Sequence, residues 1–213
     1  MRITSCTVGA FQENCYLVVD EATNAAVLVD PGAEPDRLIE LVRDSGAELR
    51  AIWVTHAHLD HVGGIAGVRR TWKVPIFLHT AARAMYDRVS VQAAAYGLPF
   101  EQPDPPNAEF RDGELAAVGT TLFEILYTPG HAPGHVVLRS DTVLVAGDLL
   151  FAGSIGRTDL PHSNPAQMEQ SLARVCELPN ETVVYPGHGP LTTIGAERES
   201  NPFLNGAARI LKR

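Results

Sequence analysis

Cysteine is scarce in this chain, and the cysteines present are poorly spaced for a disulfide framework or a thiolate metal site. Cys6, Cys15 and Cys176 are odd in number and form no CxxC pair. Cys6 and Cys15 could face each other across a hairpin, but reduced, partly buried thiols fit the spacing better. Reduced thiols are typical of a reducing compartment, so we expect a cytoplasmic location.

Long apolar runs and clusters of positive charge are missing as well. No apolar stretch approaches the length of a membrane span, and the N-terminal MRITSCTVGAF has neither the apolar core nor the cleavage pattern of a signal peptide. Lys and Arg number 17 against 25 Asp and Glu, which gives a formal net charge of −8 at pH 7, and the basic residues are scattered. We therefore expect neither a nucleic-acid nor a membrane partner.

What the chain does have is enough apolar material for a core. Its 213 residues are 45% hydrophobic, which suffices for one sizeable core. We expect strands at 2–8, 15–20, 25–30, 51–54, 75–79, 121–127, 135–140, 142–146 and 182–185. We expect helices at 33–45, 62–72, 80–96, 165–178 and 201–213. This interleaving predicts a layered α/β fold, and because no linker is visible we expect a single domain, 1–213.

One segment suits neither a helix nor a strand. Residues 98–107 read LPFEQPDPPN and are too rich in proline for either element. We expect a loop here, which is either a lid over a site or a plain surface connection.

Four of the predicted strands each run directly into a polar cluster. AIWV is followed by THAHLDHVGG, LFEILY by TPGH, TVLVA by GD, and TVVY by PGH. In layered α/β structures, ligands bind at the carboxyl ends of strands, because the loops there converge on one crevice. The clusters supply seven potential metal ligands: His56, His58, Asp60, His61, His131, Asp148 and His188.

This ligand set indicates two metal ions. Imidazole nitrogens with carboxylate oxygens, and without thiolates, suit Zn²⁺, Fe²⁺ or Mn²⁺. A single zinc ion with an open position needs only three protein ligands, so the set is too large for one ion and about right for two. We therefore expect two divalent metal ions as cofactors, with zinc favoured over iron or manganese.

The motifs THAHLDHVGG, TPGHAPGH, AGDLLF and YPGHG together resemble those of the metallo-β-lactamase superfamily. With GSIGRTDLP and ERESNPFL added, essentially the whole chain resembles the small glyoxalase II-type hydroxyacylglutathione hydrolases, in a form without the C-terminal helical domain. The resemblance implies an αββα sandwich with a dinuclear metal site at the edge between its two sheets.

The resemblance also implies a role for each ligand. It places His56, His58 and His131 on the first metal, Asp60, His61 and His188 on the second, and Asp148 between the two. It further implies that Asp30, in LVDPG, and His135, in PGHAPGH, orient ligand imidazoles.

The chemistry implied by such a site is hydrolysis. Two metals that share a bridging water lower its pKa toward neutrality, so that hydroxide is present at working pH. The bridging hydroxide would attack a thioester carbonyl, with Asp60 and Asp148 as the catalytic residues and Asp60 collecting the proton. The resemblance implies a small-molecule glutathione thioester as substrate, of which S-D-lactoylglutathione, hydrolysed to D-lactate and glutathione in methylglyoxal detoxification, is the type.

Glutathione is anionic, so an acidic chain needs a local cation to bind it. Arg157, in SIGRTDLP, occupies the place where glyoxalase II-like proteins carry a basic residue for the glycine carboxylate. The sequence departs from the longer glyoxalase II enzymes, which carry a C-terminal helical region with basic contacts and a tyrosine after the last histidine. Here the sequence ends at Arg213, where Arg209, Lys212 or Arg213 could substitute, and Gly189-Pro190 follows the histidine.

Other functions stay open at the level of sequence. Persulfide dioxygenases share the fold, the histidine cluster and a GRTD-like loop, yet work with one iron and oxygen. The same site could also serve a hydrolase of another thioester or ester, such as a lactonase. The β-lactamases proper lack the bridging aspartate that is present here as Asp148. A protein that only keeps a metal is disfavoured by the complete ligand set.

Overall fold

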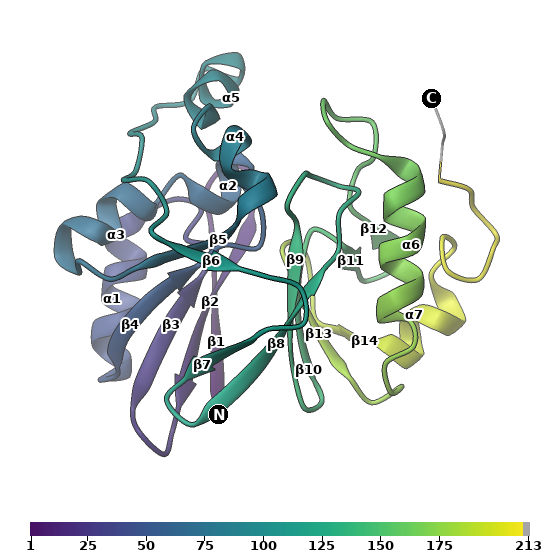
Figure 1. The fold of residues 1–213 in the computed structure, drawn as a ribbon, viewed down its shortest axis with the longest axis horizontal. Helices are drawn as coiled ribbons and strands as arrows, with labels where there is room; N and C mark the ends of the chain where they lie inside the picture. The colour runs from purple at the N-terminus through teal and green to yellow at the C-terminus, as the bar shows by residue number, and fades with distance from the viewer. Residues whose placement is uncertain (211–213) are drawn as a thin grey trace.

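Two six-stranded β-sheets lie face to face in the computed structural model, which describes residues 1–210 (Figure 1). The first sheet contains, in spatial order, β1 (Arg2–Val8), β2 (Glu13–Asp20), β3 (Ala25–Val29), β4 (Glu48–Trp53), β5 (Ile76–His79) and β6 (Ala108–Phe110). The second contains β14 (Thr192–Thr193), β13 (Val183–Pro186), β10 (Val143–Gly147), β9 (Val136–Ser140), β8 (Thr121–Tyr127) and β7 (Leu115–Val118). A separate hairpin pairs β11 (Leu150–Phe151) with β12 (Ser154–Ile155).

Helices cover the outer face of each sheet, as Figure 1 shows. Those beside the first sheet are α1 (Pro35–Ser45), α2 (Leu59–Val62), α3 (Ile65–Thr71), the 3₁₀ turn η1 (Thr80–Ala82), α4 (Arg83–Tyr86) and α5 (Val89–Tyr96). Those beside the second sheet are α6 (Pro165–Val175) and α7 (Ile194–Ser200). The layers are therefore helix, sheet, sheet, helix, which confirms the predicted αββα sandwich. Within residues 1–210, no helix is both long and apolar enough to cross a membrane.

The predicted helix from Asn201 to the C-terminus is wrong within the described residues. Helix α7 ends at Ser200, and residues 201–210 contain turns and no helix. Asn201 has extended backbone angles, φ −71° and ψ 119°, as expected for a residue that precedes a proline. Its side-chain oxygen accepts from the backbone N–H of Phe203 at 3.0 Å, which closes a turn in place of a helical start.

Strand β2 packs against a different apolar core on each of its two faces. All eight of its residues are buried. Cys15, Leu17 and Val19 belong to the core beneath α1 and α3, whereas Tyr16 and Val18 belong to the core between the sheets. Side chains alternate across a strand, so a continuous apolar run indicates two apolar environments.

The core between the sheets is built around Trp53 at the end of β4. Its ring makes edge contacts with Phe110, at 5.8 Å between centroids, and with Phe123 of the second sheet, at 5.5 Å. Aromatic pairs in this geometry contribute beyond the area they bury. This packing fixes the carboxyl end of β4 against the second sheet, and the predicted site follows directly after that end.

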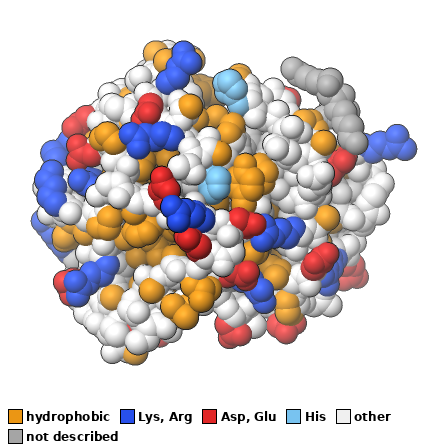
Figure 2. All heavy atoms as spheres, viewed as in Figure 1, with side chains coloured by type: hydrophobic (Ala, Val, Ile, Leu, Met, Phe, Trp, Pro, Cys, Tyr) orange, Lys and Arg blue, Asp and Glu red, His pale blue; other side chains and the backbone are white. Residues whose placement is uncertain are grey.

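Neither the surface nor the cysteines contradict the sequence expectations. Positive and negative side chains are interspersed on the face drawn in Figure 2. Cys6 and Cys15 lie opposite each other in the β1–β2 register, and both are free thiols. Residues 98–107 carry no regular secondary structure, as expected.

A buried carboxylate joins the two sheets at the end away from the site. Asp20, at the end of β2, accepts hydrogen bonds from the hydroxyl of Thr23 at 2.6 Å, the N–H of Thr120 at 2.8 Å and the hydroxyl of Thr121 at 3.0 Å. The bond from the backbone of Thr120, followed by that from Thr23, lowers the pKa of Asp20 below its usual range. A carboxylate that accepts several hydrogen bonds favours its ionised form.

We expect Asp20→Asn to lower Tm by a few degrees at pH 7, because the amide cannot accept all of these bonds. The folded pKa of Asp20 lies below the unfolded value of about 4, so its stabilisation is complete above that value and is lost as pH falls through the folded pKa. The difference in Tm between wild type and variant should therefore shrink in strong acid. Thermal denaturation followed by circular dichroism measures this, with the exposed Asp44→Asn as control, and equal Tm values at pH 7 would contradict it.

Candidate metal centre

The polar clusters that follow four strands meet at one edge of the sandwich. Strand β4 leads to His56 and His58, and α2 carries Asp60 and His61. Strands β8, β10 and β13 lead to the other three predicted ligands, His131, Asp148 and His188. The structure thus brings together all seven residues that the sequence nominates, and every one of them is buried or partly buried.

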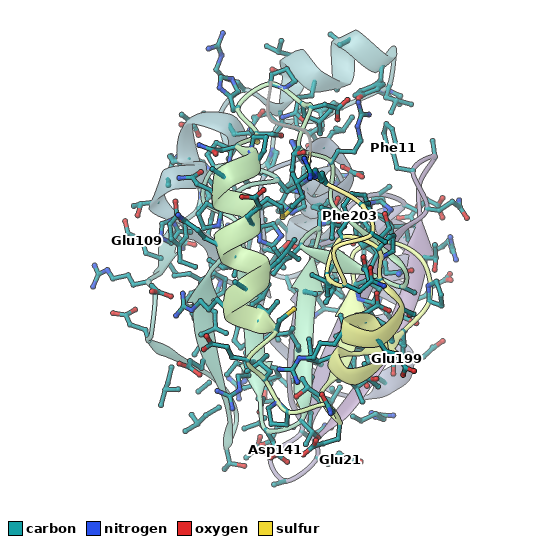
Figure 3. The ribbon with its side chains drawn as sticks, turned by 90° about the vertical axis from the view of Figure 1, so that its right-hand side faces the viewer. Phe11, Glu21, Glu109, Asp141, Glu199 and Phe203 are labelled. Carbon is teal, nitrogen blue, oxygen red and sulfur yellow. The ribbon has the colours of Figure 1, made fainter. Side chains whose placement is uncertain are left out.

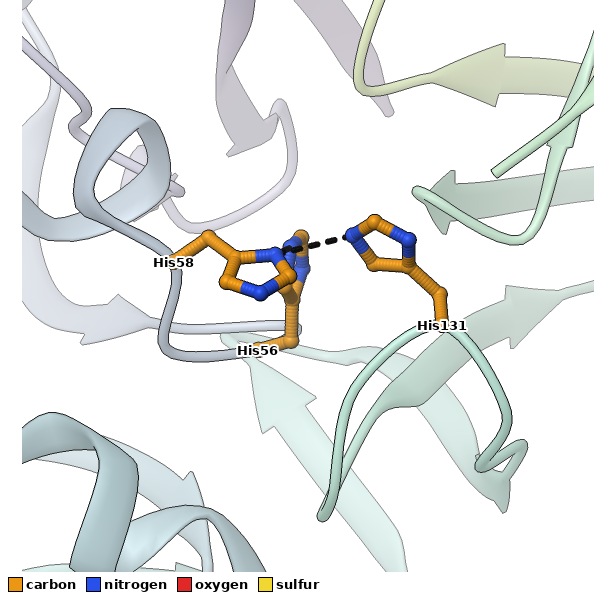
Figure 4. Close-up of side chains that lie close together, drawn as sticks. All are labelled: His56, His58 and His131. Carbon is orange, nitrogen blue, oxygen red and sulfur yellow. Dashed lines mark hydrogen bonds between the residues drawn. The ribbon is translucent and has the colours of Figure 1, made fainter. Parts of the chain in front are cut away.

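Three imidazoles form the first triad, which consists of His56, His58 and His131 (Figure 4). His58 Nδ1 lies 3.1 Å from His56 Nε2 and 2.8 Å from His131 Nε2. The three nitrogens therefore point at a common centre, from two loops that are 73 residues apart in sequence.

The second triad consists of Asp60, His61 and His188, and Asp148 lies between the two triads. His188 Nε2 is 3.3 Å from Asp60 Oδ2. Asp148 turns Oδ1 toward His61 Nε2 at 3.3 Å and Oδ2 toward His131 Nε2 at 3.4 Å. One carboxylate thus touches a member of each triad, which is the placement that a bridging ligand requires.

Partners that can only accept hydrogen bonds fix the protons on two of the histidines. His131 Nδ1 donates to the backbone carbonyl of Arg157 at 2.9 Å, and His188 Nδ1 donates to that of Phe11 at 3.1 Å. A neutral imidazole carries one proton. In both residues Nε2 therefore presents a lone pair to the cluster, which is the form that binds a metal.

Asp30 fixes the protons of two further histidines. Its Oδ2 accepts from His61 Nδ1 at 3.0 Å and from the Thr55 hydroxyl at 2.6 Å. Because the Thr55 hydroxyl donates its hydrogen to Asp30, its oxygen can only accept a hydrogen bond from His56 Nδ1, which lies 3.1 Å away. Asp30 has a left-handed backbone, with φ 51°, which is costly for a non-glycine residue, and its buried hydrogen bonds offset that cost.

His135 has a different role from the one expected. Its Nδ1 donates to the Thr128 hydroxyl at 2.9 Å, and its Nε2 accepts from the backbone N–H of Asp148 at 3.1 Å. No hydrogen bond joins it to a ligand imidazole among the described residues. His135 therefore holds the main chain of the residue between the triads, and burial lowers its pKa to about 3, so it is neutral.

Burial also keeps the first triad neutral. Desolvation lowers the pKa of His56 well below its usual value, that of His58 to about 3, and that of His131 by a smaller amount. Protons therefore do not compete for these nitrogens near neutral pH.

At the second triad, nearby carboxylates raise a histidine pKa instead of letting burial lower it. Burial opposes charge on His61, but Asp148 and then Asp60 outweigh it and raise the pKa of His61 well above its usual value. Burial raises the pKa of Asp148, but His61, His131 and His188 together lower it by more, so that this carboxyl stays ionised. A cation is thus electrostatically favoured at this end of the cluster.

The donor set fits divalent cations. His61 Nε2 and Asp148 Oδ1 are buried and face each other at 3.3 Å, yet neither makes a well-formed hydrogen bond with any described residue. Unpaired buried polar atoms are costly, and lone pairs that converge from several rings repel one another unless a cation lies between them. Imidazole nitrogens and carboxylate oxygens without thiolate are the ligands of Zn²⁺, Fe²⁺ and Mn²⁺.

Glycine allows the backbone to approach the cluster closely. A Cβ on Gly187 would lie 2.2 Å from Asp148 Oδ1 and 2.9 Å from His61 Cε1. The glycine before the last histidine therefore leaves room for the carboxylate between the triads.

Sequence reasoning missed the residues that hold the His188 loop in place by hydrogen bonds. Asn14 donates from its backbone N–H to Gly187 O at 2.8 Å and from its side chain to Gly189 O at 2.8 Å. The Tyr16 hydroxyl donates to Pro186 O at 2.7 Å. The one visible signal was a polar residue, Asn14, directly before the apolar run that begins at Cys15. Glu13 beside it is fully buried, and desolvation raises its pKa well above the usual value.

A cavity of about 870 Å³ opens above the cluster. Its floor includes His58, Asp60, His131, Asp148 and His188, and its walls come from the Phe11 turn, from α4 and α5, and from the loop at 157–162. No residue of the 98–107 loop lines it, so this loop is a surface connection in the structure and not a lid.

The predicted basic contacts lie in different places. Arg157 lines the cavity, and its guanidinium donates to both oxygens of Asp159, at 2.8 and 2.9 Å. Arg209 lines a different cavity, together with Cys176 and Phe203, the latter labelled in Figure 3. Lys212 and Arg213 lie outside the described residues.

The family model described as the metallo-β-lactamase superfamily matches residues 8–188. The chain belongs to the metallo-β-lactamase superfamily. It is 37% identical to the hydroxyacylglutathione hydrolase GloC of Haemophilus influenzae, an alignment that covers 96% of this chain and 99% of the relative.

Two solved structures of this superfamily are similar over nearly the whole chain. TTHA1623 in a di-iron-bound form is 41% identical, with a TM-score of 0.88, and the match covers 94% of this chain and all of the other. The B3 metallo-β-lactamase BLEG-1 is 35% identical, with a TM-score of 0.89, over 96% of this chain and all of the other. The sandwich is therefore the fold of the superfamily.

Replacing the carboxylate between the triads tests whether it joins two metal sites. We expect Asp148→Asn to bind about one divalent ion fewer per chain than the wild type, because a neutral amide is a far poorer bridging ligand than a carboxylate. Metal content after dialysis, measured by plasma mass spectrometry, reports this. The exposed Asp44→Asn is the matched control, and an unchanged metal content in Asp148→Asn would contradict the bridging role.

Proposed function

We propose that this protein is a metal-dependent thioester hydrolase whose substrates are glutathione thioesters, with S-D-lactoylglutathione as the type. The observation that carries the proposal is the pair of triads with Asp148 between them, set on the floor of an open cavity. In this proposal His56, His58 and His131 hold the first ion, Asp60, His61 and His188 hold the second, and Asp148 bridges both.

The lining of the cavity supports hydrolysis by water. Among the described residues that line it, none is serine, threonine, cysteine or lysine. The described lining of this cavity therefore offers no hydroxyl, thiol or amine of the kinds that usually form covalent acyl intermediates. The nucleophile must come from solvent, and the cavity is open to solvent directly above the cluster.

Divalent ions bound here would supply a Lewis acid and lower the pKa of water to a value at which hydroxide forms near neutrality. The chain's own residues supply the geometry. The carbonyls of Phe11 and Arg157 keep His188 and His131 in the tautomer that presents Nε2, and Asp30 does the same for His61. Asp60, with about a fifth of its side chain exposed, can accept a proton from the attacking water.

We propose zinc as the metal, since nitrogen and oxygen donors without thiolate suit it and its lack of redox chemistry suits hydrolysis. Iron and manganese satisfy the same donors, and the similar TTHA1623 structure is in a di-iron-bound form. The similarity to GloC, a hydroxyacylglutathione hydrolase, supports the choice of glutathione thioesters.

A persulfide dioxygenase with one iron is the main competing function. The first triad is complete without the second, so it could hold a single ion. The second triad is also complete, and the carboxylate of Asp148 touches a member of each triad, which favours the two-metal hydrolase. Hydrolysis of another thioester or ester on the same site is the remaining alternative, and the likeness to the β-lactamase BLEG-1 keeps it in view.

Loss of thioester absorbance tests the proposal directly. We expect metal-loaded protein to hydrolyse S-D-lactoylglutathione in a saturable manner, with activity removed by a chelator and restored by Zn²⁺. Oxygen uptake with glutathione persulfide, in place of thioester hydrolysis, would instead establish the dioxygenase. Metal-loaded protein that turns over neither substrate would refute both.

Arg157 stays the predicted contact for the glycine carboxylate of glutathione. We expect Arg157→Ala to raise KM for the glutathione thioester several-fold more than KM for a short uncharged thioester, because only the glutathione thioester has a carboxylate that can bind this guanidinium. The substrate carboxylate must compete with Asp159, which keeps the expected effect to several-fold. Steady-state kinetics on both substrates measure the ratio. An equal change in both KM values would show that Arg157 does not contact a carboxylate.

A further inference from the structure

One wall of the cavity is a helical arm, which we define as residues 83–96 of α4 and α5. Tyr86, Val89 and Ala93 face inward and are fully or almost fully buried. The opposite stripe faces the cavity and consists of Ala84, Met85, Arg88, Val91, Gln92, Ala95 and Tyr96. Spacings of three and four residues place such a stripe on one face of a helix.

The stripe is mostly apolar and well exposed. Val91 is 60% exposed and Tyr96 57%. The ring of Tyr96 makes an edge contact with Phe11 at 5.1 Å between centroids, and Phe11 lies at the same end of the molecule as α5 (Figure 3). Exposed apolar side chains that line a cavity are typical of a ligand-binding wall.

A hydrogen bond joins the arm to the loop that carries the predicted metal ligands. The side-chain oxygen of Gln92 accepts from the backbone N–H of Leu59 at 3.1 Å, and Leu59 lies between two predicted ligands, His58 and Asp60. Arg88 precedes Gln92 by four residues, or about one helical turn. The guanidinium of Arg88 is therefore carried on the cavity side of the arm, near the metal-binding loop but not in it.

The charges around the cavity single out Arg88. The other arginine of the lining, Arg157, is bound by both oxygens of Asp159, and Arg83 on the same arm is bound by Asp87. Arg88 has no hydrogen bond or ion pair with any described residue. Of the two arginines among the described residues that line the cavity, it is the one without a carboxylate partner in that part of the chain.

We propose that Arg88 binds a carboxylate of the substrate's thiol half and thereby sets the specificity of the site. The proposal rests on the proposed thioesterase function and adds a contact that Arg157 alone does not supply. A planar guanidinium with free donors binds a carboxylate through two parallel hydrogen bonds. The apolar stripe of Met85, Val91 and Tyr96 contacts the uncharged part of the same ligand while Arg88 holds its end.

Binding of S-methylglutathione, which cannot be hydrolysed, tests this contact without catalysis. By calorimetry on the metal-loaded protein, we expect Arg88→Gln to weaken binding by about 10- to 100-fold, the effect of losing a charge-assisted pair. Arg88→Lys keeps the charge without the fork and should recover part of the affinity. Arg83→Gln, on the same arm but outside the cavity lining, is the matched control and should bind as the wild type does.

Kinetics give a second readout that separates this proposal from the proposed function. We expect Arg88→Gln to lower the ratio of kcat/KM for S-D-lactoylglutathione to kcat/KM for the lactoyl thioester of N-acetylcysteamine, an uncharged thiol, by about 10-fold or more. A ratio within twofold of the wild type, in an active enzyme, would overturn the role of Arg88 alone.

Two further outcomes are decisive. In the first, the wild type hydrolyses neither thioester while Arg88→Gln still abolishes binding of S-methylglutathione. This result would refute the proposed function and support the carboxylate site. If coenzyme A binds with higher affinity than S-methylglutathione, and this binding requires Arg88, then Arg88 recognises a phosphate. That result would overturn the carboxylate assignment.

Discussion

The placement of protons on the five histidines of the two triads is the constraint on which the site depends. Four of them donate a hydrogen bond from Nδ1 to an oxygen: a carbonyl for His131 and His188, the Asp30 carboxylate for His61, and the Thr55 hydroxyl for His56. Their Nε2 atoms are then directed at the same small volume, with a lone pair on each neutral ring. Such an arrangement is unfavourable in an empty apolar interior and favourable around cations, so the surrounding hydrogen bonds specify the chemistry of the centre as much as the ligands do.

Much of the site could be predicted because the sequence shows where apolar strands end in polar residues. AIWV, TVLVA and TVVY are apolar runs that end abruptly in histidine, aspartate and glycine, and parallel strands bring their carboxyl ends to one edge. The long strand β2 was equally legible, since a continuous apolar run indicates a strand covered on both faces. The predicted helix at the C-terminus failed because a local turn at Asn201, next to a proline, outweighed the apolar pattern that follows it.

Contacts made by the main chain, or by polar residues inside strands, could not be predicted. The family resemblance implied that His135 orients imidazoles, whereas its Nε2 accepts a hydrogen bond from the backbone N–H of Asp148. Asn14 binds a loop more than 170 residues away, and nothing in its neighbourhood names that partner. The pairing of Arg157 with Asp159, and the lack of a partner for Arg88 among the described residues, likewise follow from side-chain packing, which the sequence does not reveal.

The carbonyls of Phe11 and Arg157 give the site an unusual freedom to change. These residues orient His188 and His131 through their main chains, while their side chains form parts of the cavity wall. A mutation at either position alters what the cavity can accept but leaves the orienting oxygen in place, because every amino acid has the same carbonyl. Substitutions at these two positions can therefore change the substrates that the cavity accepts without disturbing the orientation of the two histidines. A lineage with this architecture would diversify in specificity faster than in chemistry.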